Sequence, residues 1–381
     1  MSFQFPTYLS HDIEIKYAKG ALIIDTNDKK YIDFISGIAV CNLGHQHEDI
    51  KSAIIEQLDK VWHTSNLFKS SLREEVAQLL INSTNGSSVF FCNSGAEANE
   101  AALKLARKHT GKTKIVTFKN SFHGRTFATM SATGQTKVNQ GFGPLVPTFE
   151  YIPFNDIHSL ETLEGDDYAA IMLEIVQGEG GVNPATSCFI ETLVKTCRRL
   201  KALLIVDEVQ TGIGRTGLPF GFQHYAISPD IITTAKGLGS GFPIGAMIGK
   251  KELVETFNPG THGTTMGGNQ LAMAAAKATL EIIFQDNFLR EVESKGKFML
   301  DRLKEGLKNV VVVQEVRGLG LMIGIELKCN NSIIIKELLE KGVITLAAGT
   351  NVIRIVPPLT ISLEEIEKGI EIIIESLKNK Y

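Results

Sequence analysis

Long hydrophobic runs are absent from this sequence. No apolar stretch reaches the roughly 18 residues that a membrane-spanning helix needs. The N-terminus, MSFQFPTYLSH, also lacks the basic region followed by an apolar run that marks a secretory signal. We therefore expect a soluble, cytoplasmic protein that has no membrane partner.

Cysteine is scarce, and the charges nearly balance. The five cysteines are odd in number, widely spaced and without a CxxC pair, so the sequence predicts neither a disulfide framework nor a zinc site. His45 and His47 stand close together, but no third ligand accompanies them, and we expect no metal. A net charge of -3 gives no electrostatic reason to expect binding to nucleic acid.

A globular chain with a large core is what remains. The sequence has 381 residues, 43% of them hydrophobic, which is enough for two or three domains. Apolar runs that predict buried strands alternate with segments of helical period, so we expect an α/β fold. From Val310 the pattern changes to short strands and helices, which indicates a smaller α+β domain.

The stretch from Leu203 to Gly245 contains the strongest chemical signal. Its first apolar run ends at Asp207, and a second run, Ile231 to Thr234, ends two residues before Lys236. Parallel strands gather their functional side chains at their carboxyl ends. The sequence therefore predicts that Asp207 and Lys236 lie in one crevice.

A lysine beside an aspartate suits pyridoxal phosphate. The cofactor's aldehyde needs a lysine amine, and its ring nitrogen stays protonated when a carboxylate lies beside it. A surface lysine and a surface aspartate are the commoner explanation for any such pair. Here Lys236 lies in TTAKGLGSGFPIG, whose glycines allow the backbone to approach a ligand closely, and this favours the cofactor site.

The segments DEVQTGIGRTG and TTAKGLGSGFPIGA resemble the class III aminotransferases of pyridoxal phosphate fold type I. The resemblance implies a large domain whose mostly parallel central sheet lies between helices, together with a smaller α+β domain. It implies that Lys236 holds the cofactor covalently and that Asp207 pairs with the ring nitrogen. Val209 would stack on the ring, and Gln210 would reach its phenolic oxygen.

A competing motif lies in the same stretch. Gly212, Gly214 and Gly217 spell GxGxxG after a strand, which is the dinucleotide fingerprint of nicotinamide-dependent oxidoreductases. That fingerprint also needs a long helix and, about 20 residues on, an acidic residue. The chain instead continues through Leu218 and Pro219 as a loop, so we interpret the match as accidental.

The segment SGAEANE predicts a phosphate site. A short strand, Ser88 to Phe91, turns through Ser94 and Gly95 into a helix, and such a helix start offers free N–H groups to an anion. An ordinary capped helix is the alternative. The resemblance implies that Gly95 and Ala96 bind the cofactor phosphate through their backbone, with a side-chain contact from Ser94.

Two further segments predict how substrates are held. The motif FHGRT offers Phe122 as a ring to stack on the cofactor and Arg125 as a fork for a carboxylate. The family resemblance implies that Glu179 pairs with Arg354 and masks its charge until a glutamate-like substrate needs that arginine. A static ion pair is the alternative.

A dimer follows from the resemblance. The loop THGTTMGGNQ crosses the subunit interface in this family, which assigns Thr265 to the partner's cofactor phosphate and Thr264 to its substrate. Tyr8 stands where ornithine-type relatives place a tyrosine near the substrate, and a terminal aromatic without a role is an equal alternative. We expect three regions: an N-terminal segment (1–45) that joins the small domain, the large domain (46–270), and the helical connection with the small domain (271–381).

The combination of motifs is most similar to the acetylornithine type within the family. It implies transfer of the distal amino group of N2-acetylornithine to 2-oxoglutarate, which yields glutamate. Ornithine, succinylornithine and succinyl-diaminopimelate remain open as alternative donors. The chain departs from the usual pattern at four positions, and those near the interface loop leave substrate choice open: Cys41, Ile175, Met266 and Gln270.

Overall fold

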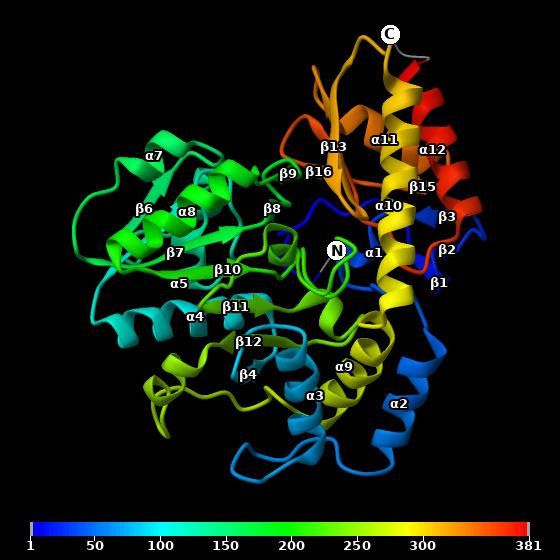
Figure 1. Ribbon diagram of the computed structural model, residues 1–381. Helices are drawn as coiled ribbons and strands as arrows, with labels where there is room; N and C mark the ends of the chain where they lie inside the picture. Colours follow the sequence, from blue (N-terminus) through cyan, green and yellow to red (C-terminus); the bar gives the residue numbers. More distant parts are fainter. Residues whose placement is uncertain (1–2, 379–381) are drawn as a thin grey trace.

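The computed structural model describes residues 3–378 and centres on a seven-stranded sheet (Figure 1). Its strand order is β4-β12-β11-β10-β7-β5-β6, and only β12 runs antiparallel to its neighbours. The predicted mostly parallel sheet is therefore confirmed. The strands are β4 (Ser88–Cys92), β5 (Lys114–Phe118), β6 (Phe149–Ile152), β7 (Tyr168–Glu174), β10 (Leu203–Asp207), β11 (Ile231–Thr234) and β12 (Gly245–Gly249).

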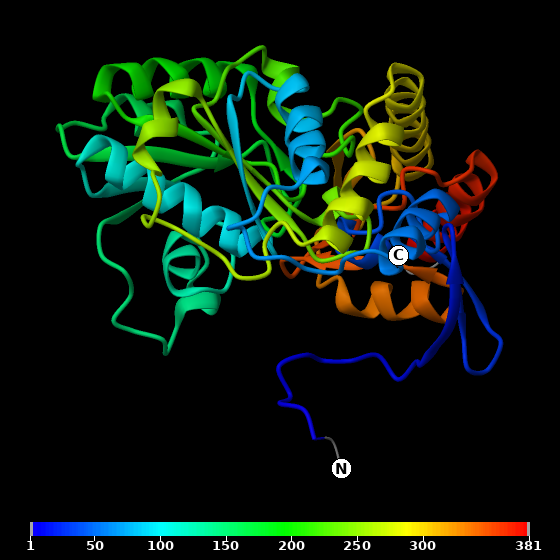
Figure 2. The ribbon, with the colours of Figure 1, turned by 90° about the horizontal axis from the view of Figure 1, so that it is seen from below.

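Helices cover both faces of this sheet (Figures 1 and 2). Helices α4 (Gly95–Thr110) and α5 (Phe127–Ala132) lie on one face, and α7 (Ile157–Glu161) and α8 (Ser187–Leu200) lie on the other. Helix α9 (Gln270–Ile283) packs against α2 (Glu48–Leu58) and α3 (Ser71–Asn82). The short helical turns are α6 (Thr136–Asn139), η1 (Gly221–Tyr225), η2 (Lys236–Leu238) and η3 (Lys251–Thr256).

The central strands are buried along their whole length because helices cover the sheet on both sides. Every residue of β7 is buried, and so is every residue of β11. Such strands read as continuous apolar runs and not as alternating ones. This is why the predicted strand at Ile231–Thr234 agrees with β11 and why the run from Leu203 agrees with β10, which extends one residue further to Asp207.

The N-terminal and C-terminal parts of the chain share a second body beside the large sheet. Strand β3 pairs in parallel with β15, so the N-terminal hairpin joins the C-terminal segment, and β1 adds a strand that the sequence did not predict. The elements of this body are β1 (Ile15–Lys19), β2 (Leu22–Asp25), β3 (Lys30–Asp33), β13 (Val313–Leu319), β14 (Met322–Leu327), β15 (Val343–Ile344), β16 (Leu346–Ala348), β17 (Val352–Ile355), α11 (Ser332–Glu340) and α12 (Leu363–Lys378).

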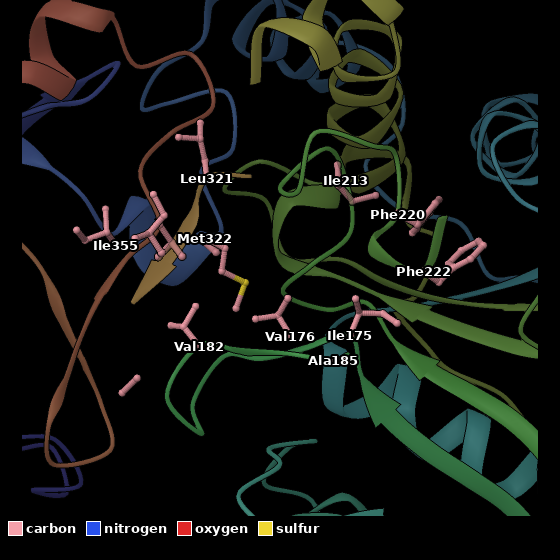
Figure 3. Packing of buried hydrophobic residues seen from close by; sticks show 14 of the residues in the cluster. Ile175, Val176, Val182, Ala185, Ile213, Phe220, Phe222, Leu321, Met322 and Ile355 are labelled. Carbon is pink, nitrogen blue, oxygen red and sulfur yellow. The ribbon is translucent and has the colours of Figure 1, made fainter. Parts of the chain in front are cut away.

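The long helix α10 (Asp286–Leu307) connects the two bodies and packs against α12 and β13 (Figure 1). Apolar side chains fill the junction, where Val176 and Val182 from the β8 (Val176–Gln177) and β9 (Asn183–Pro184) hairpin lie near Met322 and Ile355 (Figure 3). All four of these side chains are completely buried. The core is therefore continuous between the bodies.

A buried arginine ties three segments together at the same junction. Arg215, in the loop after β10, has no exposed surface. Its guanidinium donates to the carbonyl oxygens of Leu321 and Pro357 and to the side-chain oxygen of Asn42. Burial lowers the pKa of Arg215 to about 9. The arginine of the motif GIGRTG therefore helps to hold the two bodies together. The chain after Gly217 continues as a loop and not as a long helix.

The turn α1 (Ser36–Ala39) leads from the N-terminal hairpin toward the large sheet in an unusual conformation. Four consecutive residues have φ between 44° and 71°, in the left-handed region that ordinary side chains avoid. Gly37 tolerates this region easily, but Ile38 does not. The carboxylate of Asp33 accepts hydrogen bonds from the backbone at the start of the turn and helps to hold it.

Within residues 3–378, no helix combines the length and the apolar character that crossing a membrane requires.

Candidate active site

A cavity of about 430 Å³ opens where the carboxyl ends of β7, β10 and β11 meet the start of α4. Nine of the residues that the sequence proposed for the site line it together. They come from four separate segments of the chain and are Ser94, Gly95, Ala96, Phe122, Arg125, Asp207, Val209, Gln210 and Lys236.

Asp207 is fixed at the floor of this cavity. Its Oδ2 accepts hydrogen bonds from Asn99 Nδ2 at 2.8 Å and lies 2.7 Å from Nδ1 of His123, while its Oδ1 accepts from the N–H of Val209 at 3.0 Å. Burial acts to lower the pKa of His123, but the hydrogen bond and charge of Asp207 outweigh it and raise that pKa. The imidazole of His123 and the amide of Asn99 therefore fix the orientation of the Asp207 carboxylate.

Lys236 stands across the same cavity, directly after β11. Its backbone has φ of 39°, and no described residue hydrogen-bonds its amine. Burial, followed by the positive charge of Arg354, lowers the pKa of Lys236 to about 8. An amine with a lowered pKa is partly neutral near neutral pH, and the neutral form is the nucleophile.

The start of α4 faces the cavity with free backbone N–H groups. Ser94 is the N-cap and accepts the N–H of Glu97 at 3.2 Å. The Glu97 carboxylate accepts from the backbone N–H of Asn93 at 2.6 Å and not from that of Ser94, so only half of a capping box is formed. A Cβ at Gly95 would lie 2.8 Å from Val209, so only glycine fits between the helix start and that side chain. This geometry is that of an anion site.

The loop that carries Phe122 and Arg125 is held from below by two acids on adjacent strands. Glu174 ends β7 beside Asp207 in the parallel register, and its Oε2 accepts the N–H of Phe122 at 3.0 Å. The next residue of the loop is His123, which binds Asp207. Burial, together with the charge of Asp207, raises the pKa of Glu174 to about 7.

Glu179 and Arg354 form an ion pair at the edge of the site. The distance from Arg354 Nη1 to Glu179 Oε1 is 2.6 Å, and the same nitrogen donates to Gln210 Oε1 at 3.2 Å. Arg354 belongs to β17 and is 2% exposed, whereas the Glu179 side chain is 32% exposed. Burial acts to raise the pKa of Glu179, but Arg354 outweighs it and the net pKa is lowered.

Besides Glu179 and Arg354, which lie at its edge, three predicted residues do not line the cavity of their own chain. Thr265 is exposed, and Thr264 instead accepts hydrogen bonds from Asn93 Nδ2 and from the N–H of Gly267. Tyr8 is 86% exposed on the N-terminal arm, which extends away from the body of the molecule (Figure 2). Their roles remain predictions that concern a second subunit or a moved arm.

The sequence reasoning missed two residues of the site and understated a third. Asn99 and His123 were inside the motifs SGAEANE and FHGRT, but neither was assigned a role. Glu174 follows an apolar run that the sequence marks as a strand, so the only role that it suggested was to order the end of that strand. The available signal was that each polar residue stood within a few positions of a predicted strand end or helix start.

Comparison with known proteins identifies the family. The family model described as "Aminotransferase class-III" matches residues 6–377. The chain belongs to the class III aminotransferases and is an aminotransferase. The predicted family, fold and class of enzyme are confirmed.

Individual relatives resemble the chain over almost its whole length. An acetylornithine aminotransferase of Bacillus subtilis (strain 168) is 57% identical over 371 residues, which cover 97% of this chain and 96% of the relative. One of Listeria innocua is 52% identical, with 98% and 97% covered.

Solved structures agree with these relatives. The ornithine aminotransferase from Toxoplasma gondii ME49 superposes with a TM-score of 0.94 at 32% identity, covering 98% of this chain and 92% of that one. The N-acetylornithine aminotransferase from Stenotrophomonas maltophilia K279a has a TM-score of 0.85 at 37% identity, covering 97% and 96%. A second Toxoplasma gondii structure is described as having partial occupancy of pyridoxal phosphate at its active site.

Proposed function

We propose that this aminotransferase uses pyridoxal phosphate to transfer the distal amino group of N2-acetylornithine to 2-oxoglutarate. The products are N-acetylglutamate 5-semialdehyde and glutamate, as in arginine biosynthesis. The observation that carries the proposal is one buried cavity that joins Lys236 and Asp207, with the Glu179–Arg354 ion pair at its edge. Relatives with more than half of their residues identical carry the acetylornithine aminotransferase name.

The residues of the cavity fit the cofactor. The start of α4 at Gly95 and Ala96 offers N–H groups and the positive end of a helix dipole to a phosphate. Asp207, buried and supported by His123, suits a protonated ring nitrogen. Val209 and Phe122 both line the cavity and would hold the two faces of a flat ring. When bound, pyridoxal phosphate supplies an electron-poor ring that withdraws charge from the substrate carbon.

Lys236 would carry the proton transfers. Its Nζ would hold the cofactor, and the amine, once free, would take a proton from the substrate carbon that bears the amino group. A pKa near 8 suits this exchange, because general catalysis works best when the pKa lies near the working pH. Asp207, held by Asn99 and His123, would face the ring nitrogen at the opposite end of the site.

Arg354 and Glu179 account for the use of two unlike substrates. Acetylornithine presents its distal amine and has no carboxylate beside the reacting carbon, so an unmasked Arg354 would have no partner in this substrate. Its α-carboxylate lies at the other end of the molecule, where Arg125 would bind it. Glutamate presents its α-amine, and its α-carboxylate needs the bidentate fork of Arg354. Glu179 masks Arg354 in the present arrangement and leaves it when the dicarboxylate binds.

A homodimer in the cytoplasm is part of the proposal. Thr265 is exposed and lies outside its own chain's cavity, which suits a contact with the cofactor phosphate of a partner subunit. Thr264 and Tyr8 would approach the substrate in the same assembly. The large and small domains, with boundaries near residues 45 and 270, would form each site along their junction.

A comparison of amino donors tests the function. The cofactor-loaded enzyme is supplied with 2-oxoglutarate and either N-acetylornithine, ornithine, succinylornithine or succinyl-diaminopimelate, and kcat/KM is measured for each. We expect N-acetylornithine to have the highest value. A higher value for any other donor would replace the substrate assignment and leave the aminotransferase mechanism intact.

A further inference from the structure

A second cavity adjoins the site on the side of Glu179. It has a volume of about 680 Å³ and lies between the turn at Glu179, the segment around α6 and the turn that leads into β17. Glu179 is the only carboxylate among the described residues that line it, and Lys119 and Lys137 are the cations. The cavity therefore offers positive charge on the side of Glu179 away from Arg354.

Lys137 lies in α6, which is anchored to its neighbours, and it lines the same cavity as Glu179. Val138 in α6 is buried, and Gln135 just before it donates to the carbonyl oxygens of Asn120 and Ser121. The side chain of Lys137 is exposed and makes no hydrogen bond or ion pair with a described residue. Its charge nevertheless contributes to the lowered pKa of the Glu179 carboxyl, after the larger effects of burial, Arg354 and Lys236.

The backbone around Glu179 leaves only the side chain free to move. A Cβ at Gly178 would lie 2.4 Å from Gln210 Oε1, and a Cβ at Gly180 would lie 2.6 Å from the carbonyl oxygen of Asn120. The glycines on both sides are thus closely packed against their neighbours. Rotation about the side-chain bonds of Glu179 toward the second cavity, which it already lines, changes its partner without moving the chain.

We propose that Lys137 is a positioning residue that receives the Glu179 carboxylate when a dicarboxylate substrate takes Arg354. The inference rests on the proposed function, in which Arg354 must be exposed for 2-oxoglutarate and glutamate. A carboxylate that loses its arginine partner raises the free energy of the protein if its charge stays unpaired in a partly buried place. Lys137 supplies the opposite charge, so the open arrangement is stabilised and Glu179 does not compete with the substrate for Arg354.

Glutarate binding to the cofactor-loaded enzyme tests this inference without turnover. Glutarate carries the two carboxylates of 2-oxoglutarate but lacks the keto group that reacts. We expect Lys137→Met to weaken glutarate binding by about 3- to 10-fold, in keeping with a partly exposed ion pair. Lys137→Arg should bind glutarate within about twofold of the wild type, and the KM for N-acetylornithine should not change in either variant.

Two controls separate a partner for Glu179 from other effects of a positive charge. Lys119→Met removes a second lysine from the same cavity and should leave glutarate binding unchanged. In a Glu179→Gln background the side chain at position 179 carries no charge, and Lys137→Met should then have no effect on glutarate binding. Isothermal calorimetry on the wild type, Lys137→Met, Glu179→Gln and the double variant measures the coupling energy between the two side chains directly.

Several results would overturn the proposal. Unchanged glutarate binding in Lys137→Met would show that Glu179 needs no such partner. An effect that persists in the Glu179→Gln background would show that Lys137 touches the dicarboxylate itself, and an equal effect of Lys119→Met would indicate a general attraction. Failure of the proposed function looks different, because the wild-type enzyme would then not use N-acetylornithine at all.

Discussion

His123 and Asp207 contact each other at the buried floor of the site, with 2.7 Å between Nδ1 and Oδ2. The pair joins the loop after β5 to the end of β10, so it links the loop that carries Phe122 and Arg125 to the carboxylate of Asp207. Asn99 from α4 completes the arrangement. The orientation of Asp207 is therefore set by three elements of the fold before any cofactor binds.

Replacing Lys236 would remove both the proposed attachment point of the cofactor and the proposed general base. We expect Lys236→Ala to lose transamination by at least about 100-fold, the lower range of general base catalysis. It should also lose the chromophore that borohydride fixes to the protein. Lys297→Ala, at an exposed lysine, is the control and should keep both. Retention of the fixed chromophore in Lys236→Ala would end the assignment.

Uptake of the cofactor by the protein stripped of it should depend on pH. Because the pKa of Lys236 is lowered to about 8, its amine is mainly protonated below pH 8 and mainly neutral and reactive above it. The rate of cofactor attachment should rise through a midpoint near 8, measured by stopped-flow absorbance. Since the charge of Arg354 contributes to lowering this pKa, Arg354→Gln should move the midpoint upward. A midpoint near 10, as for an exposed lysine, would contradict the burial argument.

A side chain at Gly95 should disturb cofactor binding specifically. The Cβ of Gly95→Ala would lie 2.8 Å from both methyl carbons of Val209, and it would push Val209 toward the place of the ring. We expect the dissociation constant for pyridoxal phosphate to rise by about 10-fold or more, as for a clash costing somewhat more than 1 kcal/mol. Gly249→Ala, at the end of β12, is the control, because its Cβ would meet only ordinary contacts at 3.8 Å or more. Equilibrium dialysis measures both.

Glu174 should make stability depend on pH. Its folded-state pKa is raised to about 7 from 4.5, so between these values the folded state binds more protons than the unfolded state. The free energy of unfolding should therefore fall as the pH rises from about 4.5 to 7, by about 1 to 3 kcal/mol from this group. Glu174→Gln keeps an acceptor for the N–H of Phe122 and should lose this part of the slope. Urea unfolding across this pH range gives the comparison, and an unchanged slope would show that Glu174 is ionised throughout.

Mixed dimers should reveal a site built from two chains. Thr265→Val should weaken cofactor binding, and Lys236→Ala should be inactive. In a dimer with one chain of each kind, one of the two sites receives an intact lysine and an intact threonine from different chains. At limiting pyridoxal phosphate we expect mixing after partial unfolding to restore activity above that of either variant. Activity no higher than the sum of the two would argue that Thr265 acts within its own chain or not at all.

The sequence predicted the site where the chemistry lies at the ends of continuous apolar strands. The strands before Asp207 and Lys236 were recognised because buried parallel strands are uniformly apolar, and strand ends gather at one edge of a sheet. Their meeting in one cavity followed from this rule.

Contacts between distant segments were beyond local patterns. The ion pair between Arg354 and Glu179 joins residues that are 175 positions apart, and only the family resemblance pointed to it. The bond between His123 and Asp207 joins residues that are 84 positions apart, and no periodicity records such a pair. Strand β1 was missed because its residues are largely exposed and show little of the alternation that marks a strand.

The guanidinium of Arg215 makes its three hydrogen bonds only when parts of the chain from near residue 42, from 321 and from 357 are all present around it. A fragment that ended before residue 321 would keep this cation in an apolar surrounding with its acceptors missing, at a cost of several kcal/mol. The two bodies of the molecule are accordingly expected to melt in a single cooperative transition, and neither is a separable folding unit.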